Sequence, residues 1–147
     1  MREILFRGKA INRDNGYHRT NYKNGDWVYG LITRLYDERF LMLPAEMTDI
    51  KGVSGIEVDY KTIGQYTGLT DKNGKKIFEE DIVNVNTKKD ETHNMYKGRH
   101  LVIRFDEYHR FVASGRLEYP LCNHYEWEAI SNIHDNPELL KGDKDNG

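Results

Sequence analysis

Residues 62–83 read TIGQYTGLTDKNGKKIFEEDIV, and this stretch decides the fold. Glycines punctuate an aromatic segment, the dipeptide Asn73-Gly74 follows, and an acidic run then leads into apolar residues. Asn-Gly is typical of a β-hairpin, because both residues tolerate the positive φ angles of a type I′ turn. The stretch has no nucleophile–base pair, phosphate cradle or metal-ligand spacing, so it predicts architecture. Its predicted structural residues are Gly64, Tyr66, Gly68, Asn73, Gly74 and Asp81.

Elsewhere the apolar residues recur with a period of two, which indicates strands with one buried face. Residues 27–36 and 40–43 predict a hairpin whose second strand ends at Pro44, since proline lacks a ladder donor. A second hairpin is predicted from 100–105 and 111–113. The remaining predictions are strands at 3–11, 55–58, 82–86 and 129–133, a helical turn or bend at 79–81, an exposed loop at 87–97, and a short helix at 137–140 capped by Asn136.

These elements predict a mainly β protein of antiparallel hairpins, with an SH3-like partial barrel in the C-terminal half and one or two short helices. A chain of 147 residues fits one domain over 1–140, which could comprise lobes at 1–60 and 61–140. Residues 141–147 are expected to be a disordered tail.

The composition narrows the class of protein. Apolar residues make up 37% of the chain against a usual value of about 45–50%, while ten Tyr, five Phe and two Trp add large amphipathic side chains. This balance favours thin β layers or subunit interfaces over a thick helical core. The net charge of −2 argues against a strongly basic nucleic-acid footprint across the whole domain. One cysteine allows no internal disulfide, and no apolar run reaches the length of a membrane span. We therefore expect a cytoplasmic protein with no membrane partner.

Histidine and cysteine raise the possibility of a metal site. Cys122 and His124 are two residues apart and would share one face of a strand, and His134 follows. The spacing of a four-ligand zinc site is missing, so we expect no metal or other cofactor and interpret Cys122 as a buried thiol. A metal-assisted hydrolase stays an alternative.

Acidic residues cluster near the Asn-Gly turn. Glu79, Glu80 and Asp81 follow Asp71 by about ten residues. Paired carboxylates can carry general acid–base chemistry, but they more often accept hydrogen bonds from turns. The sequence therefore predicts no catalytic residues and a protein that is not an enzyme.

The second predicted hairpin carries basic and aromatic residues together. With Tyr108 and Phe111 between them, the cations could contact phosphates while the rings stack on bases. Asp106 and Glu107 lie in the same segment, so a solvated hairpin with balanced charge is the alternative. The candidate nucleic-acid contacts are Lys97, Arg99, His100, Arg104, His109 and Arg110.

Tyr125 and Trp127 are the candidate subunit-interface residues. Aromatic residues are enriched in interface centres, and hairpin-rich chains carry open sheet edges that pairing of subunits would cover. The alternative is that both residues belong to the core of the monomer. We expect a homo-oligomer in which these aromatic residues reach a subunit boundary.

Four segments resemble the YopX-like family of bacteriophage and prophage proteins: REILFRGK at 2–9, DWVYG at 26–30, IGQYTGLTDKNGKKIFEEDIV at 63–83 and AISNIHDNPELL at 129–140. They span nearly the whole chain in order. The chain has Glu80 and Ser131 where the family tends to have glycine. The resemblance implies a phage origin, self-association and no established biochemical activity, and it supplies no catalytic residues.

Together these inferences predict a non-enzymatic phage accessory protein that acts by homo-oligomerisation and by binding another macromolecule, such as a phage or host protein. The alternatives are a nucleic-acid-binding module and the metal-assisted hydrolase.

Overall fold

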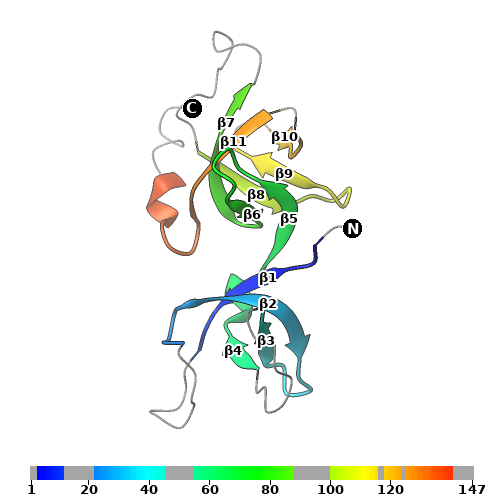
Figure 1. Cartoon of the computed structure of the whole chain (residues 1–147), viewed down its shortest axis with the longest axis vertical. Coiled ribbons are helices and arrows are strands. Elements are labelled where there is room, and N and C mark those ends of the chain that lie inside the picture. Colours follow the sequence, from blue (N-terminus) through cyan, green and yellow to red (C-terminus); the bar gives the residue numbers. More distant parts are fainter. Residues whose placement is uncertain are drawn as a thin grey trace. The chain divides into compact units, whose positions relative to one another are not determined.

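The computed structural model describes residues 3–11, 22–45, 55–87, 100–115, 118–123 and 125–140. The chain divides into two compact units, Met1–Tyr66 and Thr67–Gly147. Antiparallel strands make up most of both, as Figure 1 shows, and the predicted mainly β class is confirmed. Among these residues, no helix has the length and apolar character that crossing a bilayer requires.

The first unit is built on a meander of four antiparallel strands in the order β4-β3-β2-β1. The first predicted hairpin forms its centre, and Pro44 is the last residue of its second strand, as predicted. A 3-10 helix, η1, follows the meander. The elements are β1 (Phe6–Lys9), β2 (Trp27–Arg34), β3 (Phe40–Pro44), β4 (Ile56–Val58) and η1 (Tyr60–Thr62).

The core of the first unit lies on one face of this meander. Val28 of β2 and Met42 of β3 are fully buried on this face. Pairing of Met42 with Ile56 carries the same face into β4. Gly30 lets two backbones approach closely, because a Cβ at this position would lie 1.9 Å from the carbonyl oxygen of Leu43. The buried cluster comprises Ala10, Val28, Met42, Ile56 and Val58.

β5 (Gly64–Thr70) begins in the first unit and continues into the second. Its first residues pair with β1, with Gly64 opposite Arg7, and β6 is its neighbour on the other side. The rest of the second unit is a five-stranded antiparallel sheet in the order β10-β9-β8-β7-β11. The elements are β6 (Lys76–Phe78), β7 (Asp81–Thr87), β8 (Leu101–Phe105), β9 (Phe111–Ser114), β10 (Glu118–Pro120), β11 (Tyr125–Asn132) and the 3-10 helix η3 (Pro137–Leu140).

The core of the second unit draws on β6 and on four strands of the five-stranded sheet. The buried cluster comprises Ile77, Val83, Val85, Leu101, Ile103, Ala113 and Trp127. Over the described strands, the sheets remain open and do not close into a barrel. The SH3-like partial barrel therefore stays a prediction.

Several predicted elements differ from those observed. β11 begins at Tyr125 and not at residue 129, and β10 was not predicted. The turn predicted at 79–81 is present at residues 79–80, and Asp81 already belongs to β7. The predicted loop at 87–97 begins inside β7, and its remaining residues lie outside the described part of the chain, as does the predicted tail at 141–147. The short C-terminal helix is present, but the side-chain oxygen of Asn136 accepts a 2.5 Å hydrogen bond from Ser131.

Three hairpins share one turn geometry, at residues 35–39, 71–75 and 106–110. In each, the first N–H donates to the fifth carbonyl oxygen, at 2.8, 2.7 and 2.8 Å. The fourth N–H donates back to the first carbonyl oxygen, at 3.0, 3.0 and 3.2 Å. The fourth residue has positive φ: 68° for Glu38, 81° for Gly74 and 61° for His109. This is a type I turn followed by one residue in the left-handed region.

The predicted type I′ turn at Asn73-Gly74 is therefore wrong. Such a turn needs positive φ at both residues, and within the described chain Gly74 has it while Asn73 does not. The Asn-Gly signal located the hairpin correctly but not its loop length, which is three residues.

These two residues allow a direct test of the turn. Gly74→Ala should lower the free energy of unfolding by about 1 kcal/mol, because an L-residue is strained at this φ although a Cβ there would meet no atom within 4 Å. Asn73→Ala is the matched control and should change it by less than about 0.5 kcal/mol, the usual range for a surface position. Urea unfolding measures both. A loss for Asn73→Ala as large as that for Gly74→Ala would contradict the assigned turn.

Candidate functional site

The Asp71 side chain organises the turn in the decisive stretch. One carboxylate oxygen accepts hydrogen bonds from the N–H groups of Asn73 and Lys75, both at 2.9 Å. The other accepts from the N–H of Ala129 at 3.0 Å, 58 positions away in the chain. The Lys72 N–H also donates to the carbonyl oxygen of Trp127 at 2.9 Å. The turn is thus tied to β11 by backbone and side-chain hydrogen bonds.

The environment of Asp71 favours the ionised carboxylate. Burial acts to raise its pKa, but the hydrogen bonds from the backbones of Ala129, Lys75 and Asn73 outweigh it, so the pKa lies below its usual value. Lys75 adds a smaller favourable charge interaction. Asp71 is therefore an anion held by the fold, which is a structural role and not that of a proton donor near neutral pH.

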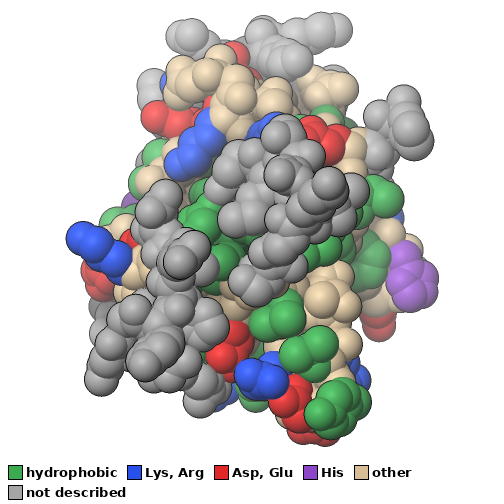
Figure 2. Space-filling view, turned by 60° about the horizontal axis from the view of Figure 1, so that its bottom comes forward, with side chains coloured by type: hydrophobic (Ala, Val, Ile, Leu, Met, Phe, Trp, Pro, Cys, Tyr) green, Lys and Arg blue, Asp and Glu red, His purple; other side chains and the backbone are tan. Residues whose placement is uncertain are grey.

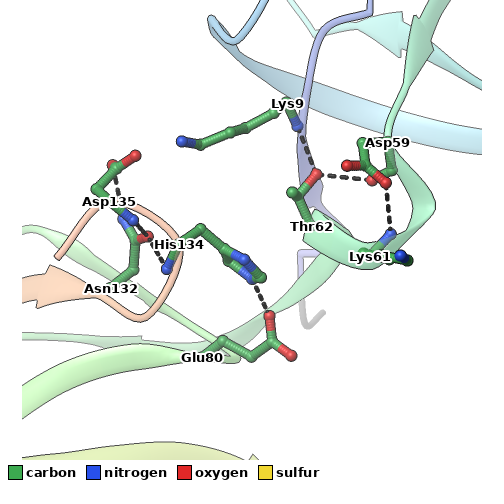
Figure 3. Close-up of polar contacts among 8 residues, drawn as sticks. All are labelled: Lys9, Asp59, Lys61, Thr62, Glu80, Asn132, His134 and Asp135. Atoms are coloured by element: carbon green, nitrogen blue, oxygen red, sulfur yellow. Dashed lines mark hydrogen bonds and ion pairs between the residues drawn. The ribbon is translucent and has the colours of Figure 1, made fainter. Parts of the chain in front are cut away.

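A polar cluster surrounds the start of β7, as Figure 3 shows. Glu80 has φ of 68°, its N–H donates to the carbonyl oxygen of Ile103 at 2.7 Å, and its carboxylate pairs with Nε2 of His134. Asn132 holds the turn that carries this histidine, because its Oδ1 accepts from the N–H groups of His134 at 3.0 Å and Asp135 at 2.9 Å. In a His–Glu pair, the carboxylate fixes the orientation of the imidazole ring, and such a ring can serve as a proton acceptor.

The first unit contains a separate polar cluster at η1, also drawn in Figure 3. Asp59 caps η1, since its Oδ1 accepts from the N–H of Lys61 at 3.1 Å. The Thr62 hydroxyl accepts from the N–H of Lys9 at 2.8 Å and donates to the carbonyl oxygen of Asp59 at 2.7 Å. All these groups satisfy backbone partners, so the cluster is structural.

The residues of the metal alternative are only partly described. Cys122 is half-buried and its carbonyl oxygen accepts a 2.9 Å hydrogen bond from the Trp127 indole, while His124 lies outside the described residues. Across the described ranges, no three His, Cys, Asp or Glu side chains are grouped to hold a metal ion. The metal-assisted hydrolase stays a prediction.

The tip of the β8–β9 hairpin gathers several of the predicted nucleic-acid contacts. Phe105 is 49% exposed, and its ring centroid lies 5.0 Å from that of Phe111 and 5.9 Å from that of His109. Arg104 is exposed, and the Arg110 guanidinium lies 5.4 Å from the centroid of a neighbouring tyrosine ring. The exposed side chains of Arg104, Phe105, His109 and Arg110 are together called the aromatic tip.

Not every predicted contact reaches the aromatic tip. Nδ1 of His100 lies 2.9 Å from the carbonyl oxygen of Leu139, and Lys97 and Arg99 lie outside the described residues. Arg110 bonds Asp106 at 2.9 and 3.0 Å. Desolvation acts to raise the pKa of Asp106, but hydrogen bonds from the Arg110 backbone and side chain outweigh it and keep that pKa low. One cation of the tip is therefore already neutralised.

The two candidate interface residues have different surroundings. Trp127 is 3% exposed and belongs to the core of the second unit. Tyr125 is half-buried, and its ring meets those of Tyr119 and Trp127 edge-on, both with centroids 5.6 Å apart. Trp127 retains little surface for a partner, whereas Tyr125 retains part of its ring.

Sequence reasoning missed two surface features of the first unit. One is a cleft of about 450 Å³ with the aromatic residues Phe40 and Tyr60, whose centroids are 6.3 Å apart, among acidic and basic side chains. The other is the face of β2 and β3 opposite the core, where Tyr29, Leu31 and Leu43 are exposed. The alternation of WVYGLI could have revealed the second, because both of its faces are apolar.

Comparison with known proteins places the chain in a family. The sequence pattern described as YopX protein matches residues 11–141. The chain belongs to the YopX protein family. The crystal structure of protein EF1440 from Enterococcus faecalis is similar, with 25% sequence identity and a TM-score of 0.53, over 94% of this chain and 98% of that one. No curated protein matches the chain.

Glu80 and Ser131 stand at the two positions where the YopX resemblance suggests glycine. Glu80 lies at φ of 68°, a region that glycine enters without strain, and it gains the pairing with His134 in return. Ser131 follows a register shift in β11, between Ala129 and Ser131, and its hydroxyl donates to Asn136. Each replacement thus adds a polar contact where the backbone is irregular.

The charge state of Asp71 predicts how stability depends on pH. The unfolded pKa is about 3.9 and the folded pKa lies lower, so the stabilisation is complete above pH of about 5 and is lost as the pH falls through the folded pKa. Asp71→Asn should lower the free energy of unfolding by about 2 kcal/mol at neutral pH, because the amide is uncharged and has one acceptor oxygen where the carboxylate has two. The variant should also lose less stability than the parent as the pH falls.

Unfolding midpoints measured between pH 7 and pH of about 3 test this expectation. Asp106→Asn is the matched control, because Asp106 accepts the equivalent hydrogen bonds from Tyr108 and Arg110 in a turn that has no bond to another strand through its carboxylate. Equal acid limbs for the parent and Asp71→Asn would contradict the role of Asp71.

Proposed function

We propose that this YopX protein is a phage or prophage accessory protein that catalyses no reaction. It acts by self-association and by binding another macromolecule, a phage or host protein, in the cytoplasm of the bacterial host. The family membership and the character of the surface support this proposal.

One observation carries the proposal: large apolar side chains reach the surface of both units. Figure 2 shows one face of the molecule, on which hydrophobic side chains reach the surface between acidic and basic ones. Contiguous exposed apolar surface marks interaction sites more often than catalytic ones. The most exposed residues are Ile4, Leu31, Tyr36, Tyr60, Phe105 and Tyr108.

The sheets also offer edges to a partner. β10 and β11 end the second sheet. In the first sheet, the outer side of β4 already meets the segment after β1, through the Ala10–Val58 bridge and the Ile11 N–H that donates to the carbonyl oxygen of Glu57. Edge strands present backbone donors and acceptors that another strand can pair with. A homo-oligomer would cover edges and apolar side chains together, and closed symmetry is the usual result.

The carboxylates of residues 62–83 support the proposal that the protein catalyses no reaction. Asp71 accepts three hydrogen bonds from backbone N–H groups, and Asp81 accepts one from Phe78 at 2.8 Å. Glu80 pairs with His134. These groups serve the turns around β6, which leaves little reason to assign them acid–base chemistry.

A nucleic-acid-binding module is the second candidate, and the aromatic tip favours it. Exposed Phe105 and His109 could stack on bases of a single strand, with Arg104 beside them to contact phosphates. The neutralised Arg110 and the net charge of −2 argue for weak binding.

Light scattering at micromolar concentrations tests self-association. We expect a mass that is a multiple of the 17.3 kDa chain and that falls on dilution. Since apolar contacts dominate the proposed association, the mass should change little with moderate salt. A constant mass of 17.3 kDa over the whole concentration range would contradict the proposal.

Retention of a short single-stranded oligonucleotide at low salt tests the second candidate. If the aromatic tip binds, Phe105→Ala should weaken affinity roughly fivefold or more, since each stacked base contributes about 1–3 kcal/mol. Tyr36→Ala, in a fully exposed position of another hairpin turn, is the matched control. Retention that is absent at low salt, or equal in both variants, would exclude this candidate.

A further inference from the structure

The cleft of the first unit lies where two segments leave the sheet at the same end. Phe40 begins β3 and is paired with Val58, the last residue of β4. The hairpin turn at 35–39 and the helix η1 therefore leave the sheet next to each other, because antiparallel pairing puts the start of one strand beside the end of its neighbour. The cleft has a volume of about 450 Å³, within the roughly 300–1,000 Å³ of ligand sites, and is called the Tyr60 cleft.

Two aromatic rings and several charged side chains line the Tyr60 cleft. Phe40 is half-buried and Tyr60 is 61% exposed, and their ring centroids lie 6.3 Å apart. The guanidinium of Arg34 lies 6.0 Å from the Phe40 centroid, whereas Tyr60 has no such cation within the described part of the chain. The charged lining comprises the carboxylates of Asp37, Glu38, Glu57 and Asp59 and the cations of Arg39 and Lys61.

The carboxylates on the turn side of the cleft are already paired. Asp37 bonds Nε of Arg39 at 2.6 Å, and Glu38 lies 3.6 Å from Arg34, which does not line the cleft. The turn therefore contributes little net charge. On the other side, Glu57 and Asp59 stand against the single ammonium of Lys61, so the excess of negative charge lies beside Tyr60.

The backbone of the first unit holds Asp59 and the neighbouring Tyr60 in place. The N–H of Asp59 donates to the carbonyl oxygen of Lys9 at 2.9 Å, and its own carbonyl oxygen accepts from the N–H of Thr62 at 2.9 Å and from the hydroxyl at 2.7 Å. One carboxylate oxygen of Asp59 accepts from the N–H of Lys61 (Figure 3), and the other has no hydrogen bond to a described residue. A ligand that used this oxygen would find it already ordered, which lowers the cost of binding.

We propose that the Tyr60 cleft binds a segment of a partner protein that presents a lysine or arginine side chain. The cationic head lies over the ring of Tyr60 and pairs with the carboxylates of Asp59 and Glu57, while the aliphatic stem packs on Phe40. The inference rests on the proposed binding of another protein and names the site and the charge of the segment that it takes.

The lining favours a basic protein segment over other occupants. A nucleic acid or an acidic segment would bring negative charge against four carboxylates. A purely apolar segment would remove Asp59 and Glu57 from water without supplying a cation, which is costly. A free amine of a few atoms would leave most of a 450 Å³ cleft empty, whereas a segment of several residues fills it.

Fluorescence anisotropy of a labelled peptide tests the charge of the ligand. The probe is a short peptide of alternating lysine and glycine, and the same peptide with glutamate in place of lysine is its matched control. The lysine peptide should bind the full chain, with an affinity that falls as salt is added, and the glutamate peptide should not bind at the same concentrations. Amide chemical shifts should move at residues 37–40 and 57–61 and stay constant in the second unit.

Variants of Tyr60 test the aromatic contact. Tyr60→Ala should weaken binding of the lysine peptide by about fivefold or more, and Tyr60→Phe should retain it, because the ring remains. Tyr108→Ala is the matched control, since it removes a 70% exposed tyrosine from a hairpin of the second unit and should leave the affinity unchanged.

Asp59→Asn tests the carboxylate without removing the cap of η1, because asparagine caps a helix as well as aspartate does. It should weaken binding by about threefold. Glu118→Gln is its matched control, since it changes the net charge by the same amount at an exposed position of β10 and should have no effect.

The outcomes separate this inference from the proposed function. A parent chain that binds neither peptide, or both equally, overturns the cleft, while light scattering still decides self-association. Equal affinities in Tyr60→Ala and Tyr108→Ala, or shifts confined to the second unit, also overturn it. A monomeric chain that binds the lysine peptide at residues 57–61 supports the cleft and contradicts self-association. Loss of binding in Tyr60→Ala and Asp59→Asn, with retention in Tyr60→Phe, establishes a cation site on this ring.

Discussion

The Asp71 carboxylate is the constraint on which the second unit depends. It closes the β5–β6 turn through Asn73 and Lys75 and at the same time binds the backbone of Ala129 in β11. A local turn and a long-range strand contact thus share one buried anion. Ala129 immediately precedes the register shift of β11, so the same hydrogen bond fixes where the irregular part of that strand begins. This links the decisive stretch to the C-terminal block.

The hairpins could be predicted from the sequence, because alternation and turn residues are local signals. The pairs β2–β3 and β8–β9 lie close to their predicted positions. The turn type at Asn73-Gly74 was missed because Asp71 accepts hydrogen bonds from the N–H groups of Asn73 and Lys75, an arrangement that Asp106 repeats with Tyr108 and Arg110 in a turn without an Asn-Gly pair. Glu38 and His109 occupy positive φ without being glycine or asparagine, so the geometry of the three-residue hairpin loop overrides the residue preference there.

In the candidate site, too, contacts within one hairpin could be predicted and contacts between distant segments could not. The sequence placed basic and aromatic residues on one hairpin, and the aromatic tip brings Phe105, His109 and Arg104 together. It could not show that His100 faces the Leu139 carbonyl oxygen, 39 residues away. Nor could it show that Trp127 is core, because Tyr-Glu-Trp-Glu alternates in the same way whether the aromatic face meets its own sheet or a partner.

The outer face of β2 does not show the polar residues expected of a solvated strand. A strand with Val28 buried on one side and Leu31 exposed on the other has apolar residues on both faces. Such strands normally lie between two packed layers, and folding of the first unit provides a core on only one side. The internal polar groups of the described residues are largely absorbed by turns and caps, whereas this apolar surface is not used by the core of its own unit. The surface feature that the fold of the first unit leaves unexplained is therefore apolar, which points to association and not to catalysis.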